Sequence, residues 1–178
     1  MGKNLRQRFR GEWTNKVDAK GRVSIPASFR RVLETCDPDW HHKSLPNLVL
    51  VYGRKGTGCI EGYSMNSINE VDNMISALPR YSKNREILER LLNSNSVQIQ
   101  LDENGRIVLS TKLRQMIGIT TEALFAGMGE KFEVWNPISY QKNVEIMFET
   151  IKDPMNEQNL FDLLDNKIGE KKSVEDNR

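Results

Sequence analysis

Two short segments of the chain carry the same acidic and basic side chains at the same spacing. Residues 17–30 read VDAKGRVSIPASFR and residues 101–114 read LDENGRIVLSTKLR, 84 positions later. Each contains an Asp, a Gly-Arg pair that begins three residues later, and a closing Arg. Arginine and lysine at a turn bind anions such as phosphate, and arginine also donates two parallel hydrogen bonds to a planar acceptor. The two segments therefore predict a duplicated site for an anionic partner.

Four residues predict where the chain turns in these segments. An Asp at the first position of a type I turn accepts hydrogen bonds from backbone amides inside it, and a Gly adopts the positive φ that closes a bulged three-residue hairpin. The turn-forming residues are Asp18, Gly21, Asp102 and Gly105. Strand-like stretches at 11–17 and 22–26, and again at 97–101 and 106–110, predict a hairpin in each copy. A short helix is expected to follow, from Pro26 or Ser110.

The rest of each copy continues the repeat. Further strands are predicted at 48–52 and 59–63 in the first copy and at 123–126 and 131–135 in the second, with helices at 65–78, 84–92 and 138–151. The boundaries that follow are a first module at 8–64, a helical connector at 65–93, a second module at 94–151 and an acidic C-terminal tail at 152–178. One module alone is too small to bury its apolar face, so the two are expected to complete one core. A polar insertion at 35–46 is expected to form a surface excursion.

The net charge of +2 conceals an uneven distribution along the chain. Residues 1–31 contain nine basic and two acidic side chains, a net charge of +7, and the remainder carries −5. A basic front end on a nearly neutral chain is typical of proteins that contact phosphates. The alternative is a solvated basic terminus that only improves solubility.

Other residue patterns argue against enzymatic or metal chemistry. The chain has two cysteines, Cys36 and Cys59, which is too few for a disulfide framework and favours a cytoplasmic protein; no signal peptide or membrane span is predicted. The adjacent His41 and His42 lack the spacing of a zinc site. The glycine-rich stretch at 53–58 lacks the ending of a phosphate-binding loop and is interpreted as a hairpin loop, in which Arg54 and Lys55 are further candidates for contact with a phosphate backbone. No nucleophile accompanies a base, so neither catalysis, a cofactor nor a small-molecule substrate is predicted.

Three motifs together resemble one known family. The segment Phe9-Arg10-Gly11-Glu12 precedes the first Asp-x-x-x-Arg element at 18–22, and a second such element follows at 102–106. In this pattern the chain resembles the bacterial MraZ family from about residue 8 to about residue 150. The resemblance implies an α+β fold in which two SpoVT/AbrB-like halves form one double-split β-barrel with flanking helices.

The resemblance also implies a function. Members of the family are similar to transcriptional regulators of the division and cell-wall gene cluster. The resemblance therefore implies that this chain is such a regulator, and we expect it to be a repressor. They bind short direct repeats in double-stranded promoter DNA as ring-shaped, octamer-like homo-oligomers. A nucleoid-associated location follows from that role.

The candidate DNA-binding residues are Arg10, Lys16, Lys20, Arg22 and Arg106. The resemblance places Arg10, Lys20 and Arg22 at or beside the first turn. The fork of Arg22 suits guanine O6 and N7 in the major groove, whereas Lys20 and Arg10 suit phosphates. A competing role for each turn arginine is a local ion pair with the Asp of its own turn. We favour DNA contact for Arg22, because basic residues surround it, and the ion pair with Asp102 for Arg106.

The second turn differs in charge from the first. Glu103 and Asn104 occupy the positions of Ala19 and Lys20, which removes one positive charge and adds a negative one. The first turn is therefore expected to dominate DNA binding. Two rival functions remain: an antitoxin-like module, against which the internal duplication argues, and a ring scaffold that binds protein partners through the acidic tail and the last helix.

Overall fold

The computed structural model describes residues 7–41, 44–54 and 56–150. The chain divides into two compact units, residues 1–140 and residues 141–178. The first unit contains both copies of the repeated turn. The described part of the second unit is residues 141–150, which continue a helix that begins at Pro137.

The first unit contains strands and helices in one mixed α+β fold, the fold class that the family resemblance implies. The strands are β1 (Glu12–Lys16), β2 (Arg22–Ser24), β3 (Asn47–Val51), β4 (Ile60–Ser64), β5 (Ser96–Gln100), β6 (Arg106–Val108), β7 (Glu122–Gly127) and β8 (Lys131–Trp135). The helices are α1 (Ala27–Thr35), α2 (Met65–Ser76), α3 (Lys83–Leu88), the π-helical segment η1 (Glu89–Ser94), α4 (Thr111–Met116) and α5 (Pro137–Thr150), which crosses the unit boundary.

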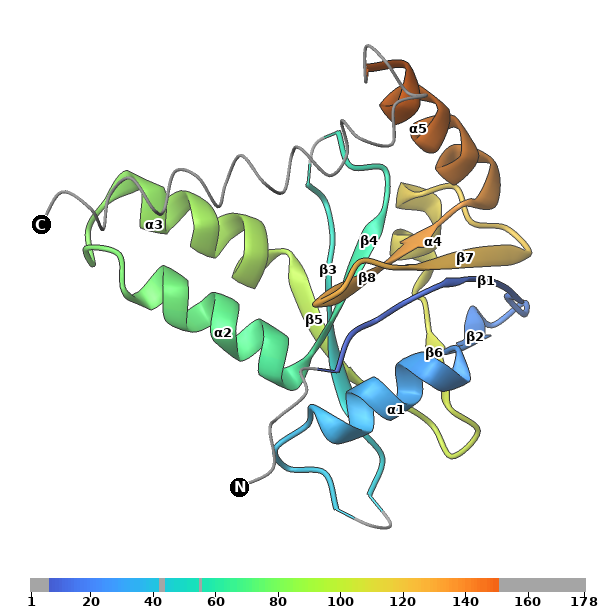
Figure 1. Cartoon of the computed structure of the whole chain (residues 1–178), viewed down its shortest axis with the longest axis horizontal. Coiled ribbons are helices and arrows are strands. Elements are labelled where there is room, and N and C mark those ends of the chain that lie inside the picture. Colours follow the sequence, from blue (N-terminus) through green and yellow to red (C-terminus); the bar gives the residue numbers. More distant parts are fainter. Residues whose placement is uncertain (1–6, 42–43, 55, 151–178) are drawn as a thin grey trace, which may run out of the picture. The chain divides into compact units, whose positions relative to one another are not determined.

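The strands form two antiparallel sheets (Figure 1). The larger sheet has the order β1-β7-β8-β4-β3-β5, and the smaller one pairs β2 with β6. Among the described residues these strands do not join into a closed barrel.

The two copies of the repeat are interleaved in both sheets. The first strand of each copy pairs with the third strand of the other, β1 with β7 and β5 with β3. The fourth strands, β4 and β8, pair with each other at the centre of the larger sheet. The strand order is therefore the same when it is followed from either edge, with each copy supplying half of the pairing that the other needs.

The predicted turns are present, but the prediction that the strands on either side of each turn pair with each other as a hairpin is wrong. In the first copy a single bridge joins Val17 to Val23, after which β1 continues to β7 and β2 pairs with β6. An isolated two-stranded hairpin is only marginally stable in water. The two strands that flank each turn diverge because each of them forms a longer ladder with a strand of the other copy. Alternation of apolar residues predicts a strand and its buried face, but it does not identify the neighbouring strand.

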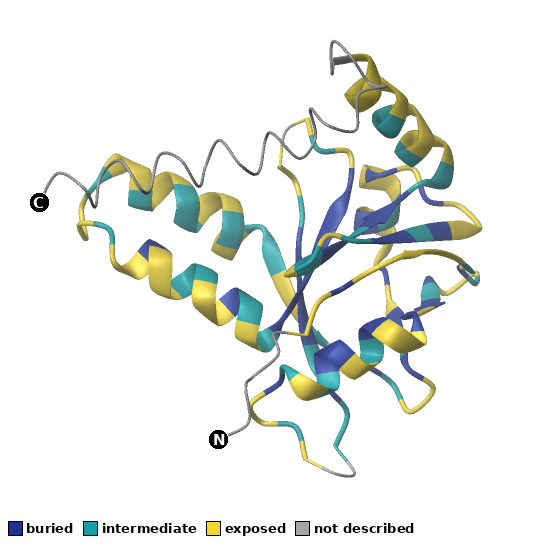
Figure 2. Cartoon of the chain, viewed as in Figure 1, coloured by how far each residue is buried: buried dark blue, intermediate teal, exposed yellow. Residues whose placement is uncertain are grey.

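One hydrophobic core lies between the two sheets and helices α1 and α4, and it draws residues from both copies (Figure 2). Four phenylalanines pack there with ring centroids 5.1–6.1 Å apart, in edge-to-face or tilted arrangements that favour aromatic pairs. These rings are Phe9, Phe29, Phe125 and Phe132. The prediction that the two copies complete one core is confirmed.

A second, smaller cluster lies on the other side of β3 and β4. Val49, Val51 and Tyr63 of these strands pack there against Ile68 of α2, with Leu92 of η1 beside them. Serine side chains cap the helices: Ser64 Oγ accepts from Ser67 N at the start of α2. These contacts join the connector to the sheet.

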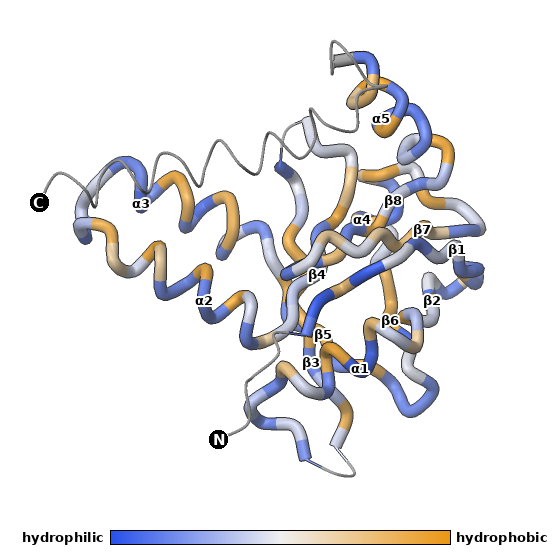
Figure 3. Tube along the Cα trace, viewed as in Figure 1, coloured by the Kyte–Doolittle hydropathy of each residue, from blue (hydrophilic) through white to orange (hydrophobic). Residues whose placement is uncertain are grey.

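The connector helices leave many apolar side chains in solvent. α2 and α3 lie side by side, and hydrophobic and hydrophilic residues alternate along both (Figures 1 and 3). Met74 is 66% exposed and Ile87 is 53% exposed. Tyr81, in the loop that joins α2 to α3, is 94% exposed. The predicted helix at 84–92 begins one residue earlier, at Lys83, and continues beyond Leu88 as the π-helical η1.

The insertion at 35–46 is anchored to the core by a buried carboxylate. Pro38, Asp39 and His41 are exposed, as expected of a surface excursion, and His42 lies outside the described residues. Asp37, however, is buried and accepts hydrogen bonds from the backbone N of Asn47 at 2.8 Å and from its Nδ2 at 3.1 Å. The excursion is thereby fastened to the start of β3.

Candidate nucleic-acid interface

The first turn is organised by the carboxylate of Asp18. Its Oδ1 accepts hydrogen bonds from the backbone N–H groups of Lys20 and Arg22, both at 2.9 Å, and its Oδ2 accepts from Arg22 Nε at 2.6 Å. The turn closes where Gly21 N donates to Asp18 O at 2.8 Å. Gly21 has a φ of 81°, in the left-handed region that favours glycine. One side chain thus fixes both the path of the backbone and the direction of the arginine.

The second turn repeats this arrangement. Asp102 Oδ1 accepts from the backbone N–H groups of Asn104 and Arg106, both at 2.9 Å, and Oδ2 accepts from Arg106 Nε at 2.8 Å. Gly105 N donates to Asp102 O at 2.8 Å, and Gly105 has a φ of 68°. The shared spacing of Asp, Gly and Arg therefore produces the same local geometry twice.

Hydrogen bonds to these carboxylates lower their pKa values. For Asp18 the backbone N–H of Arg22 contributes most to the lowered pKa, followed by the Arg22 side chain. For Asp102 the backbone N–H of Arg106 is likewise the largest cause of the lowered pKa, ahead of the Arg106 side chain. Both groups are solvent-exposed, so the pairs orient their arginines more than they stabilise the fold.

Pairing with Asp leaves most of each guanidinium group free. Arg22 and Arg106 use only Nε in side-chain hydrogen bonds with described residues, and their side chains are 40% and 31% exposed. A guanidinium carries five N–H donors, so four remain for an external acceptor. The ion pair and an anionic partner are therefore compatible roles for the same arginine, because the ion pair holds the Nη groups in place.

The ribbon formed by β2 and β6 brings the two arginines onto one face. Val23 and Ile107 are paired and point inward, where both are buried. Arg22 lies opposite Val108 and Arg106 lies opposite Ser24, so both arginines are on the outer side, separated by about 7 Å along the strands. A two-stranded β-ribbon of this kind is narrow enough to enter the major groove of DNA.

The other predicted basic residues divide into two places. Lys20 is exposed within the first turn, and Lys16 ends β1 two residues before Asp18, opposite Glu122. Arg10, expected beside the first turn, instead precedes β1 at its far end. The intervening strand separates Arg10 from Lys16 by up to about 20 Å. The structure therefore groups Lys16 and Lys20 near Arg22 and leaves Arg10 apart.

Two arginines that the sequence analysis did not select pack against the turns. A Cβ on Gly21 would lie 3.0 Å from Arg114 Nε, and a Cβ on Gly105 would lie 2.3 Å from Arg30 Nη1. Each turn is thus covered by the closing arginine of the other copy. The signal was present in the sequence, because Arg30 and Arg114 occupy equivalent positions of the repeat, but their crossed placement follows from the interleaved fold.

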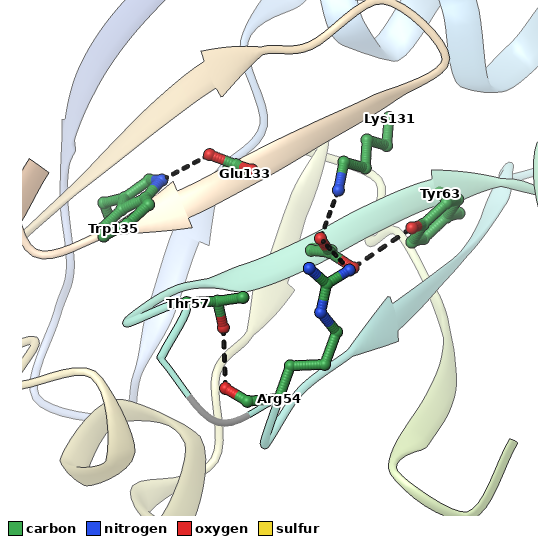
Figure 4. A network of polar contacts seen from close by, with 7 residues as sticks. Arg54, Thr57, Tyr63, Lys131, Glu133 and Trp135 are labelled. Atoms are coloured by element: carbon green, nitrogen blue, oxygen red, sulfur yellow. Dashed lines mark hydrogen bonds and ion pairs between the residues drawn. The ribbon is translucent and has the colours of Figure 1, made fainter. Parts of the chain in front are cut away.

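Arg54, considered as a contact to the DNA backbone, is instead held in a polar network on the larger sheet. Its Nη1 donates to Glu61 Oε1 at 3.1 Å, Lys131 Nζ also contacts Glu61, and Tyr63 OH donates to Glu61 Oε2 at 3.2 Å. In Figure 4 Arg54, Lys131 and Tyr63 converge on this one carboxylate. Lys55, its neighbour, lies outside the described residues.

The network neutralises a pair of like charges. Glu61 is directly opposite Glu133 in the β4–β8 pairing, and its side chain is 3% exposed. Carboxylates facing each other across two strands repel, so Arg54 and Lys131 offset a cost that these positions would otherwise carry. Burial, and then the charge of Glu61, raises the pKa of Tyr63 well above its usual range. This arrangement is structural.

The part of the chain that the structure describes holds neither a metal cluster nor a membrane-spanning helix. In the ranges that the structure describes, no group of three or more His, Cys, Asp or Glu side chains is placed to hold a metal ion. The described helices include none that is long and apolar enough to span a bilayer.

Comparison with known proteins places the chain in a family. Residues 92–159, which include the second turn, match a family model described as "MraZ protein, putative antitoxin-like". A protein of Ruegeria sp. named transcriptional regulator MraZ is 53% identical over 136 residues, which are 76% of this chain and 81% of the relative. The chain belongs to the MraZ family.

Further MraZ relatives extend the match. The transcriptional regulator MraZ of Ruegeria pomeroyi is 49% identical over 138 residues, covering 78% of this chain and 83% of the relative. That of Cereibacter sphaeroides is 41% identical over 157 residues, covering 84% and 92%. The sequence-based assignment to MraZ is confirmed.

Proposed function

We propose that this chain is a sequence-specific, non-enzymatic regulator of transcription that binds double-stranded DNA through its first turn and the β2–β6 ribbon. One observation carries the proposal: Asp18 binds Arg22 through Nε alone, on the exposed side of a two-stranded ribbon. The free Nη groups then have the direction and rigidity that base recognition requires. The names of the relatives, all transcriptional regulators, support the same conclusion.

Each basic residue has a distinct part in this proposal. Arg22 donates two parallel hydrogen bonds to guanine O6 and N7 in the major groove. Lys20 and Lys16 contact phosphates on either side of that base, and Arg10 contacts a phosphate farther along the duplex. Arg106 takes part from the same ribbon, but Glu103 beside it repels the backbone of DNA.

One turn makes too few contacts for tight specific binding, so we propose that several copies of the chain act together. A homo-oligomeric, octamer-like ring would present its first turns to successive direct repeats, and each bound repeat raises the effective concentration for the next. The exposed apolar side chains of the connector, Met74, Tyr81 and Ile87, suit contacts between subunits. The two sheets of each subunit would then be the parts of a double-split β-barrel.

The biological setting proposed here follows the family. The chain would repress the division and cell-wall gene cluster from its promoter, in the cytoplasm and on the nucleoid. Its internal duplication, in which both copies of the turn belong to modules that share one core, favours this role over that of an antitoxin with a single turn.

Fluorescence anisotropy tests the function directly. Labelled duplexes carry the direct repeats upstream of this chain's own coding sequence, a single such repeat, or a scrambled sequence of equal length and composition. Wild-type protein is expected to bind the multiple repeats with the highest affinity, to lose affinity steeply with salt, and to bind the single repeat weakly.

Two results would count against the proposal. Full affinity on the single repeat would exclude the multivalent mechanism. Equal binding to repeated and scrambled duplexes, or no binding to either, would favour the rival ring scaffold that binds protein partners.

A further inference from the structure

Residues of the second copy of the repeat contact the first turn and hold it in place. Gly21 O accepts a hydrogen bond from Leu109 N at 2.8 Å, and Leu109 O accepts from Arg114 Nε at 3.1 Å. A Cβ on Gly21 would lie 2.3 Å from Leu109 O and 3.0 Å from Arg114 Nε. Backbone and guanidinium therefore form a continuous support against the one residue of the turn that has no side chain.

The second turn has the mirrored support, with one difference. Gly105 O accepts from Ile25 N at 2.9 Å, and the side chain of Arg30 lies directly against Gly105. Arg30 Nε, however, is buried and has no hydrogen-bond partner. Arg114 therefore supports the first turn with a hydrogen bond that its counterpart does not make.

We propose that Arg114 is a positioning residue for DNA recognition: from the second copy it fixes the first turn, and thereby Arg22, in the geometry that reads a base. The inference rests on the proposed function. It means that the second module serves DNA binding chiefly by holding the first turn, while its own turn contributes little.

The contacts of Arg114 favour positioning over direct contact with DNA. The residue is half-buried, its Nε is engaged by Leu109 O, and its Nη2 donates to Thr111 Oγ1 at 3.3 Å. A recognition side chain must be held within about 0.5 Å of its working position, which requires support from residues behind it. Lysine at position 114 would keep the charge but lacks a planar group that can lie along Gly21 while donating to Leu109.

The test compares three variants on the repeat and scrambled duplexes over a salt series. Arg114→Ala is expected to lower affinity for the repeats about tenfold, because a charge-assisted hydrogen bond that orders the turn is lost. Its affinity for the scrambled duplex and the slope of log K against log salt are expected to stay those of the wild type. Arg114→Lys should fail to restore binding to the repeats. Lys142→Ala, which removes an exposed charge of α5, should bind both duplexes as the wild type does.

The outcomes separate this inference from the proposed function. Loss on both duplexes with a salt slope shallower by about one would mean a direct phosphate contact and would overturn positioning. Rescue by Arg114→Lys, or wild-type binding by Arg114→Ala, would also overturn it.

Arg22→Ala, measured beside them, tests the function itself: if it binds normally, the proposed function fails. If Arg22→Ala loses binding while Arg114→Ala retains it, only the positioning role fails. Thermal melting monitors folding, and Arg114→Lys carries the test should Arg114→Ala unfold, because it retains the stem and the charge.

Discussion

The two turns of this chain have the same geometry in different surroundings. Asp18 and Asp102 each accept two backbone hydrogen bonds and one from an arginine Nε, at distances that agree within 0.2 Å. Lys20 extends from the first turn, whereas Glu103 and Asn104 extend from the second. The Asp-x-x-Gly-Arg spacing therefore builds the turn, and the two residues between Asp and Gly set the charge that it presents to a partner.

The supports beneath the turns differ as well. The atom nearest to a Cβ added on Gly21 would be Leu109 O, a backbone atom, whereas the atoms nearest to a Cβ added on Gly105 would belong to the flexible side chain of Arg30. A backbone atom cannot withdraw without moving its strand, but an arginine can change rotamer. A side chain added at Gly21 is therefore harder to accommodate than one added at Gly105.

The largest expected effect is the loss of DNA binding by Arg22→Ala. A bidentate contact to a base contributes about 1–3 kcal/mol, and each subunit on the repeats loses one, so affinity should fall by at least about 100-fold. Arg106→Ala is expected to lower affinity less than about threefold, since Glu103 already weakens that turn. Anisotropy on the repeat duplex measures both. Equal losses would show that the two turns contribute alike.

The second prediction concerns stability. Gly21→Ala should lower the free energy of unfolding by about 2–3 kcal/mol, because a Cβ at positive φ is strained and meets backbone. Gly105→Ala should cost about 1–2 kcal/mol, because only the Arg30 side chain must move. Urea unfolding at one fixed protein concentration gives both values. A larger loss for Gly105→Ala would mean that the Arg30 side chain cannot move away from the added methyl group.

The third prediction converts the second turn into the first. The double substitution Glu103→Ala and Asn104→Lys removes a negative charge and adds a positive one beside Arg106. Affinity for the repeat duplex at low salt should rise about tenfold, and the salt dependence should steepen by about one phosphate contact. Glu149→Ala with Gln141→Lys makes the same charge change on the exposed surface of α5 and serves as the control. An equal gain from this control would show that total charge, not the turn, governs affinity.

The smallest expected effect is that of acid pH on the stability of the turns, and it should be the same for both. The pKa values of Asp18 and Asp102 lie below 3.8 in the folded chain, so each ionised carboxylate stabilises the turn fully above 3.8. That contribution is lost as the pH falls below 3.8 through the lowered pKa. NMR of the Arg22 and Arg106 Nε–H resonances should report this titration, and Asp18→Asn should abolish it in the first turn alone. A midpoint at or above 3.8 in either turn would contradict the hydrogen-bonded geometry.

Much of the local structure was predictable because its causes are local. Asp and Gly at fixed spacing place the turns, and alternating apolar residues place the strands. Strands β3, β4, β7 and β8 and the starts of the main helices lie close to the predicted positions. The DNA-binding roles of Arg10, Lys16, Lys20, Arg22 and Arg106 remain predictions.

Strand pairing was not predictable in the same way. The hairpins expected at the turns open at once, because β1 and β2 find longer partners in the other copy. Sequence pattern gives the face of a strand that is buried, and many neighbours satisfy that requirement equally well. The position of Arg10, far from the first turn, follows from the same extended path of β1.

By itself the sequence determined that the chain contains one module twice, that each module turns at an Asp and a Gly, and that the basic charge gathers at the first of these turns. Only the tertiary structure decided that each turn rests on the arginine of the other copy, and that Arg22 and Arg106 share one face of a ribbon. The reason is physical: a turn is fixed by hydrogen bonds between residues within four positions of each other, whereas the contacts of Arg30 and Arg114 join residues that come together only when the two copies interleave to bury one core.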